Sequence, residues 1–143
     1  MRFEKIPLLK VAAVLNILLA VGHIICIPWL DEAFKLYGID NLMNQISLSY
    51  GEYIPYIITI IIAACFALCA LYALSAEGVI RKLPLLWLAI FTIASIFLLR
   101  GTVGSFSMIK SGLFTMANIT SAIIAEIIGF LYLIGGIQKI NKK

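Results

Sequence analysis

Four apolar runs, each long enough to cross a lipid bilayer, constrain this chain more than any other feature of its sequence. They cover about residues 8–30, 53–76, 84–104 and 113–137. A transmembrane helix needs roughly 20 apolar residues to cross about 30 Å of hydrocarbon. Each run is predicted to be a helix, because a segment inside a bilayer must satisfy its backbone polar groups internally. We therefore expect an all-α integral membrane protein with four transmembrane helices.

The composition supports a membrane location. Apolar residues make up 63% of the chain, charged residues 13%, and the mean hydropathy is +1.09. Soluble domains are about half apolar and a quarter charged, so the apolar surplus is expected to face lipid. The net charge of +4 comes from short basic clusters between the apolar runs. That pattern indicates a partner in the lipid bilayer rather than a nucleic acid, and a single membrane domain over residues 1–143.

The distribution of Lys and Arg predicts how the chain is oriented. Eight basic residues fall in the N-terminal tail, the second loop and the C-terminal tail, against two in the other two loops. Because positive charge accumulates on the cytoplasmic side, both termini are expected in the cytoplasm of a bacterium, with the protein multi-pass in its inner membrane. Short connections make successive helices antiparallel, as in an up-down bundle. The eight residues are Arg2, Lys5, Lys10, Arg81, Lys82, Lys139, Lys142 and Lys143.

The first loop, residues 31–52, is long enough to hold more than a turn. Apolar side chains recur along it in a mixed pattern, interrupted at Gly38. This pattern predicts a short helix at the membrane interface, broken at the glycine. The loop is expected to cap the outer face of the bundle.

Small residues in the fourth span indicate where it packs. Ser121, Ala125 and Gly129 recur at intervals of four, with Ala122 and Glu126 beside them on the same side. Helices in a bilayer associate through close packing and interhelical hydrogen bonds, because lipid is as apolar as leucine. This face of the fourth span is therefore expected to point into the bundle.

The first span carries its polar residues on one stripe. Ala12, Asn16, Ala20 and His23 return to nearly the same angle around a helix. The stripe is predicted to face inward, and Asn16 is expected to form an interhelical hydrogen bond. His23 has two interpretations, a satisfied core residue or part of a polar site.

Glu126 lies near the centre of its span, where a charged side chain costs about 2.5–3.5 kcal/mol. The carboxyl is therefore expected to be either protonated at neutral pH or paired with a cation. Whether it is ionised, paired or protonated stays open. The intramembrane candidates for a partner are Arg100 and His23. A purely structural Glu126, and an Arg100 that reaches to the headgroups, are the competing interpretations.

A rise of about 1.5 Å per residue places Arg100 on the order of 9 Å outside the midplane and His23 some 6 Å outside it. A direct contact between Arg100 and Glu126 is then stretched. The expected arrangement is a chain of Arg100, His23 and Glu126 that descends from the outer face. Asn118 and Ser121 are predicted to continue it.

Most catalytic chemistries lack the residues they need. One histidine without an acid cluster cannot supply three metal ligands. The cysteines, Cys26, Cys65 and Cys69, form no CxxC pair. No Ser-His-acid set is evident. We expect no metal, no cofactor and no catalytic residue, and a protein that is not an enzyme.

Two resemblances bear on function. AIIAEIIG, residues 122–129, resembles the stretch around the essential glutamate of small multidrug resistance transporters, which have four spans and function as dimers. The resemblance implies a titrating acid with small neighbours at Glu126. In that family the glutamate lies on the first span and here on the last, so neither fold nor activity is carried over. Residues 22–29 and 70–101 resemble an uncharacterised family of small four-span bacterial inner-membrane proteins, which implies the topology and no activity.

Two hypotheses of different classes follow. The first is a non-enzymatic accessory or interaction module, whose buried polar residues fix helix packing and partner choice, with a second copy or another membrane protein as the partner. The second is a small proton-linked transporter or carrier that uses Glu126, with His23 and Arg100 tuning it.

Overall fold

The computed structural model describes residues 7–112 and 114–141, and this part of the chain contains helices and no strand. Four of the helices are long and apolar enough to cross a membrane, which confirms the predicted fold class. They are α1 (Leu8–Ile25), α4 (Ile54–Ala76), α5 (Leu86–Ser111) and α6 (Met116–Ile140). Large apolar side chains are exposed along all four, as expected for helices that face lipid.

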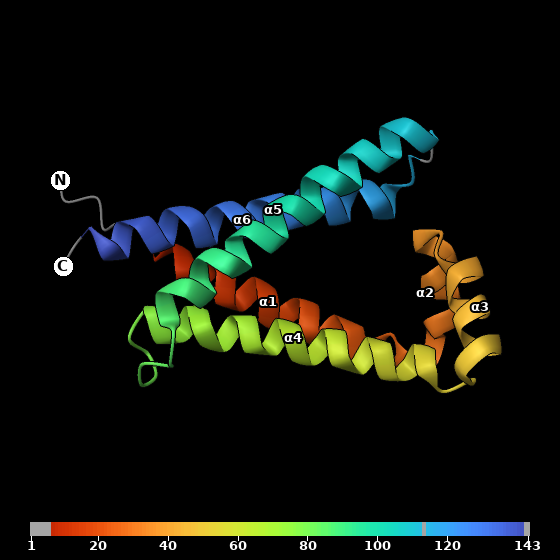
Figure 1. Ribbon diagram of the computed structural model, residues 1–143, viewed down its shortest axis with the longest axis horizontal. Coiled ribbons are helices and arrows are strands. Elements are labelled where there is room, and N and C mark those ends of the chain that lie inside the picture. The colour runs from red at the N-terminus through yellow and green to blue at the C-terminus, as the bar shows by residue number, and fades with distance from the viewer. Residues whose placement is uncertain (1–6, 113, 142–143) are drawn as a thin grey trace.

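The long loop is helical, as predicted. A 3-10 turn, η1 (Ile27–Trp29), leads into α2 (Leu30–Tyr37) and α3 (Asp40–Tyr50). Gly38 separates α2 from α3 with φ +68°, a left-handed conformation that favours glycine. Figure 1 shows α2 and α3 together at one end of the bundle, here called the loop end.

The opposite end, the terminal end, holds the start of α1, the α4–α5 connection and the end of α6 (Figure 1). The described basic residues of the predicted cytoplasmic set all belong to these segments. Arg2, Lys5, Lys142 and Lys143 lie outside the described residues. Assignment of this end to the cytoplasm stays a prediction. The described members are Lys10, Arg81, Lys82 and Lys139.

Helix bounds differ from the predicted spans where local signals decide them. The first span was expected to reach residue 30, but α1 ends at Ile25, before Pro28 enters η1. The third was expected to end at residue 104, but α5 continues to Ser111 and stops at Gly112, with φ +68°. The fourth begins at Met116, because the Thr115 side chain accepts a hydrogen bond from Asn118 N at 3.2 Å and caps the helix. Its predicted start, residue 113, lies outside the described residues.

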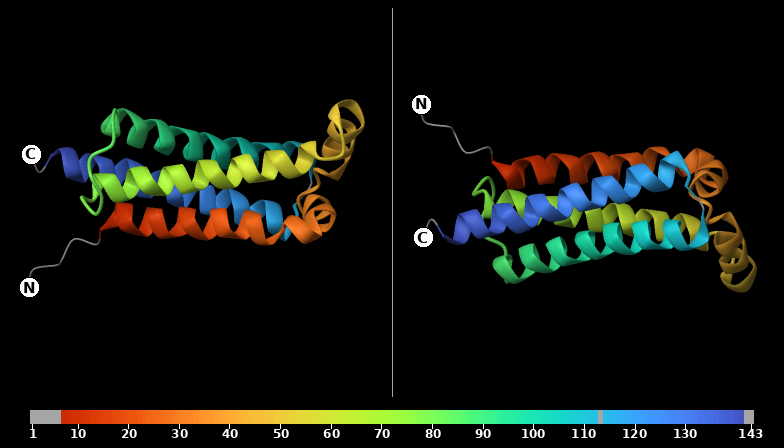
Figure 2. Two further views of the ribbon diagram at one scale, coloured as in Figure 1. Left: turned by 90° about the horizontal axis from the view of Figure 1, so that it is seen from below. Right: turned by 90° about the horizontal axis from the view of Figure 1, so that it is seen from above.

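The bundle consists of two antiparallel hairpins, α1–α4 and α5–α6 (Figure 2). They meet near the terminal end, where a Cβ at Gly135 of α6 would lie 2.8 Å from Leu9 Cγ of α1. Towards the loop end the hairpins diverge (Figure 1). α6 is therefore the central helix, since it packs against both α5 and α1.

The α5–α6 contact follows small residues, which we call the small-residue seam: Gly101 and Gly104 of α5, and Ala122, Gly129 and Gly136 of α6. A Cβ at Gly129 would lie 2.7 Å from Leu98 Cγ and 3.0 Å from Leu98 N. Ala122, Gly129 and Gly136 recur every seven residues and so lie on one face of α6. Close approach of two backbones is how helices associate strongly in lipid.

Gly129→Ala is expected to destabilise the protein, because the new methyl group would meet the Leu98 backbone. Gly22→Ala is the matched control, since a Cβ at Gly22 meets nothing within 4 Å. Both changes gain the same intrinsic helix propensity, about 0.5–1 kcal/mol. Unfolding by denaturing detergent should show a loss of stability for Gly129→Ala and none for Gly22→Ala. Equal stabilities for the two variants would contradict the close contact at the seam.

Candidate functional site

A hydrogen-bonded tie at Tyr132 joins three helices in the core. Asn16 Nδ2 on α1 donates to the Tyr132 hydroxyl on α6 at 3.1 Å and to Ala12 O at 3.0 Å. The Tyr132 hydroxyl donates to the Cys69 carbonyl of α4 at 2.7 Å. Asn16 and Tyr132 are both fully buried. The tie therefore fixes the register of α1, α4 and α6.

The prediction of an interhelical hydrogen bond from Asn16 is confirmed. Its acceptor, Tyr132, was not predicted, because a tyrosine near the end of a span resembles an interfacial anchor. The signal available was its place among Ile128, Gly129 and Gly136 on the inward face of α6. Asn16 Oδ1 is buried and has no hydrogen-bond partner among the described residues, so the core retains one unused acceptor.

Glu126 and Arg100 lie on the small-residue seam. A Cβ at Gly101 would lie 2.6 Å from Glu126 Oε1 and 2.6 Å from its Cγ. A Cβ at Gly104 would lie 2.6 Å from Arg100 Nη1. The missing side chains of Gly101 and Gly104 thus leave the space that the carboxyl and the guanidinium occupy.

The two charged groups are close neighbours in depth. Cβ positions three residues apart on a helix are about 5–6 Å apart, so Glu126 Oε1 and Arg100 Nη1 are separated by roughly 11 Å at most. Within the described part of the chain, neither group forms an ion pair or a hydrogen bond. Glu126 is partly buried and Arg100 is exposed.

Arg100 lies closer to the middle of its helix than the predicted span implied, because that span ended at residue 104. Its depth in the bilayer stays a prediction. Since α5 runs from Leu86 to Ser111, Arg100 lies within about 3 Å of its middle along the helix axis. Glu126 also lies near the middle of α6, which runs from Met116 to Ile140. The two residues therefore share a level.

His23 is held apart from this pair. Its Nδ1 lies 2.7 Å from Leu19 O, one turn earlier on α1. A carbonyl only accepts, so Nδ1 is the donor in that bond. The ring packs on Phe66 of α4 with a centroid distance of 5.1 Å. The expected chain through His23 is therefore not formed by direct contacts among the described residues.

Aromatic rings connect His23 to the core. Phe66 lies 6.1 Å from Phe97 of α5, and Phe97 stacks on Tyr132 at 6.3 Å with an interplanar angle of 8°. These offset pairs are apolar contacts that join the two hairpins near mid-height. They separate His23 from the Asn16–Tyr132 tie by two phenyl rings.

Asn118 and Ser121 form a local contact on α6. Ser121 Oγ donates to the Asn118 carbonyl at 2.9 Å, and Asn118 N donates to the Thr115 cap. Both bonds stay within the first turns of the helix. These bonds do not reach Glu126, so the role of Asn118 and Ser121 as an extension of the charged site remains a prediction.

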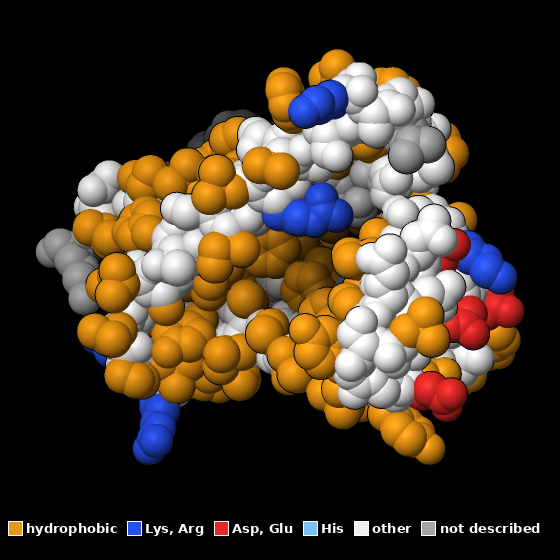
Figure 3. All heavy atoms as spheres, turned by 45° about the vertical axis from the view of Figure 1, so that its right-hand side comes forward, with side chains coloured by type: hydrophobic (Ala, Val, Ile, Leu, Met, Phe, Trp, Pro, Cys, Tyr) orange, Lys and Arg blue, Asp and Glu red, His pale blue; other side chains and the backbone are white. Residues whose placement is uncertain are grey.

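A hollow with apolar walls opens between the hairpins at the loop end (Figure 3). Figure 3 shows basic side chains on the α5–α6 side of this hollow, and acidic side chains gathered over the α2–α3 cap. The basic residues of α5 are Arg100 and Lys110. A basic side chain therefore borders the hollow, whereas the acidic side chains lie on the cap, away from it (Figure 3).

The described residues contain no group of three or more His, Cys, Asp and Glu side chains that could hold a metal ion. Comparison with protein-family models, curated proteins and solved structures gives no match. The class of protein rests on the fold itself: a small multi-pass integral membrane protein built as a four-helix bundle.

Tyr132→Phe is expected to lower the free energy of unfolding by about 1–2 kcal/mol, because it removes two buried hydrogen bonds in a setting where each contributes about 0.6 kcal/mol and at most about 1.7. Tyr72→Phe is the control, since the Tyr72 hydroxyl makes only a peripheral bond of 3.4 Å to Pro84 O. Reversible unfolding in mixed micelles measures both. A Tyr72→Phe loss as large as that of Tyr132→Phe would contradict the tie.

Proposed function

We propose that this chain is a non-enzymatic accessory protein of the bacterial inner membrane that binds another membrane protein. The observation that carries the proposal is Arg100, an exposed guanidinium near the middle of an apolar helix. Among the described residues it has neither an ion pair nor a hydrogen bond.

The energetics favour a partner at this position. A charged side chain at the centre of a membrane helix costs about 2.5–3.5 kcal/mol on insertion scales. An acidic or hydrogen-bonding side chain from a second membrane helix offsets that cost and selects the partner. The apolar hollow beside α5 and α6 gives such a helix a surface to pack on (Figure 3).

The non-enzymatic assignment is supported by how the polar side chains are used. Asn16, Tyr132 and Ser75 bond helices and loops to one another, and His23 bonds its own helix. These contacts position helices rather than gather nucleophile, base and acid at one point.

Arg100→Gln is expected to release the protein from its membrane complex. The protein is extracted from native membranes in mild detergent, and the mass of the complex is measured. Lys110→Gln is the control, because it removes the same charge from the last turn of the same helix. Arg100→Lys should retain the complex.

A complex of unchanged mass in Arg100→Gln would contradict the proposal, as would a free protomer in every variant. If the complex of the wild-type protein has twice the mass of one chain, the partner is a second copy.

A specific observation favours a proton-linked carrier as the second candidate. Glu126 is partly buried at the level of Arg100, on the small-residue seam, and forms no ion pair with a described residue. A titratable acid within a membrane helix is how small carriers couple protons to a substrate. In this alternative Arg100 and His23 tune the carboxyl.

For the carrier, the Glu126 carboxyl band in infrared spectra should change with pH in lipid, and the change should shift in Arg100→Gln. Glu126→Gln should remove the band, whereas Glu52→Gln, in the exposed loop, should leave it. A Glu126 band that does not respond to pH over the range in which the protein stays folded would exclude proton coupling through this residue.

A further inference from the structure

A second polar site lies at the terminal end, away from Arg100 and Glu126. An open cavity of about 390 Å³ is lined by the end of α4, the α4–α5 connection, the start of α5 and the end of α6. That volume is within the range of small-ligand sites, roughly 300–1,000 Å³. The residues that matter in it are Glu77, Lys82, Leu83, Leu86, Trp87 and Lys139.

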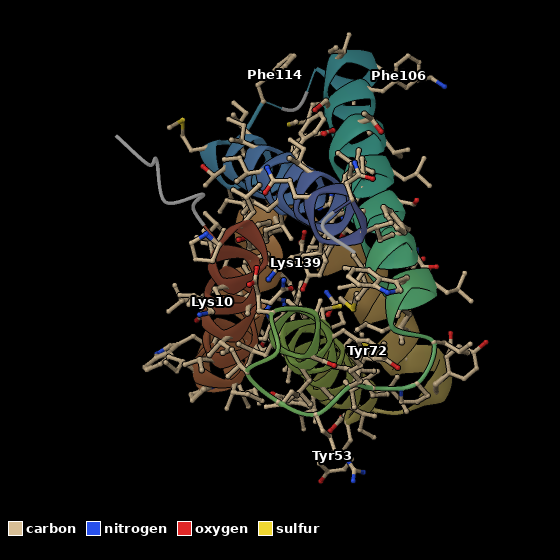
Figure 4. The ribbon with its side chains drawn as sticks, turned by 90° about the vertical axis from the view of Figure 1, so that its left-hand side faces the viewer. Lys10, Tyr53, Tyr72, Phe106, Phe114 and Lys139 are labelled. Carbon is tan, nitrogen blue, oxygen red and sulfur yellow. The ribbon has the colours of Figure 1, made fainter. Side chains whose placement is uncertain are left out.

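A partly buried ion pair forms one wall of the cavity. Lys139 Nζ lies 2.7 Å from Glu77 Oε2, and the Glu77 side chain is only 6% exposed. Figure 4, which looks onto this end, shows Lys139 between α6 and α4, whereas Lys10 lies on the outer side of α1. The Lys139 ammonium has three donors and uses one on this carboxylate oxygen, so donors remain for a ligand.

The α4–α5 connection is held in a conformation that brings Lys82 to the cavity. Ser75 Oγ donates to Arg81 O at 3.0 Å and accepts from Leu83 N at 2.9 Å, so the residues on both sides of Lys82 are fixed. Leu85 then adopts a left-handed φ of +51°, unusual for a leucine, as the chain turns into α5. Lys82 has no ion pair with any residue in the described ranges.

The charges in the cavity do not cancel. Glu77 neutralises Lys139, and Lys82 leaves one positive charge beside an apolar wall of Leu83, Leu86 and Trp87. One uncompensated cation next to apolar surface at the end of three transmembrane helices suits a singly charged anion that carries hydrocarbon. Tryptophan at a helix end and basic pockets between helix ends are both typical of the headgroup level.

We propose that this cavity binds the phosphodiester headgroup of an anionic phospholipid, such as phosphatidylglycerol, from the adjoining leaflet. Lys82 and the remaining donors of Lys139 hold the phosphate group. Leu83, Leu86 and Trp87 contact the first part of the acyl chains. The same phosphate chemistry is present in free inorganic phosphate, and the apolar wall assigns the site to the lipid.

Binding is measured through Trp87. The chain has two tryptophans, so Trp29→Phe leaves Trp87 as the single fluorophore. The emission of the Trp29→Phe variant is measured in phosphatidylcholine nanodiscs and in nanodiscs of increasing phosphatidylglycerol content. The Trp87 emission should shift with phosphatidylglycerol and saturate.

Lys82→Gln should weaken the lipid dependence roughly tenfold, since a charge-assisted contact is lost. Arg81→Gln is the matched control: it removes the same charge from the adjacent residue, whose side chain does not line the cavity. Glu77→Gln should strengthen binding, because it releases Lys139. An increase in affinity does not arise from misfolding, so this variant keeps the test decisive if Lys82→Gln is unstable.

Equal weakening in Lys82→Gln and Arg81→Gln would overturn the proposal, because it would show general attraction of the basic end to an anionic surface. Saturation of the Trp87 signal by inorganic phosphate in phosphatidylcholine nanodiscs would assign the site to a free anion and overturn the lipid assignment. A Trp87 emission that does not change with phosphatidylglycerol content would also overturn the proposal.

Discussion

Close contact between α5 and α6 along the small-residue seam determines the rest of the structure. A bilayer gives helices no gain from burying leucine, so backbones must approach closely to associate. Gly129 against Leu98 and Gly136 against Ile90 bring α5 and α6 together, and Tyr132 and Gly135, on the adjoining part of the inward face of α6, contact α1. With α6 fixed between α5 and α1, the Glu126 side chain packs into the space beside Gly101, here called the glycine notch. The position of the charged residues is thus a consequence of packing.

The topology and much of the packing could be predicted from the sequence. Apolar runs of membrane length determine the four helices, and the break at Gly38 determines two short helices in the loop, because left-handed backbone favours glycine. The inward face of α6 was predicted from Ser121, Ala125 and Gly129, with Ala122 and Glu126 beside them. Ala122, Ala125 and Gly129 are buried, and Ser121 and Glu126 are partly buried. The inward Asn16 followed from helical periodicity alone.

The site could be predicted less well, because it depends on register between helices distant in sequence. The end of α5 was placed too early, since residues 105–111 are polar enough to end an apolar run and yet continue the helix, so Arg100 lies nearer the middle of α5 than expected. Nothing local to Gly101 indicates that Glu126, on another helix, fills the space beside it. The bond from Tyr132 to the Cys69 carbonyl likewise joins residues 63 apart. Contacts of this kind follow from how hairpins dock, which hydropathy does not encode.

A double-mutant cycle between Gly101 and Glu126 tests most directly whether the carboxyl occupies the glycine notch. Gly101→Ala should lower the free energy of unfolding of the wild-type chain, because a Cβ there meets the Glu126 side chain at 2.6 Å. In a Glu126→Ala background the same change should cost nothing, or stabilise α5 by the usual glycine-to-alanine gain of about 0.5–1 kcal/mol. The stability of all four proteins is measured by unfolding in mixed micelles. Equal effects of Gly101→Ala in both backgrounds would contradict the account, because they would show that Glu126 does not lie on the seam.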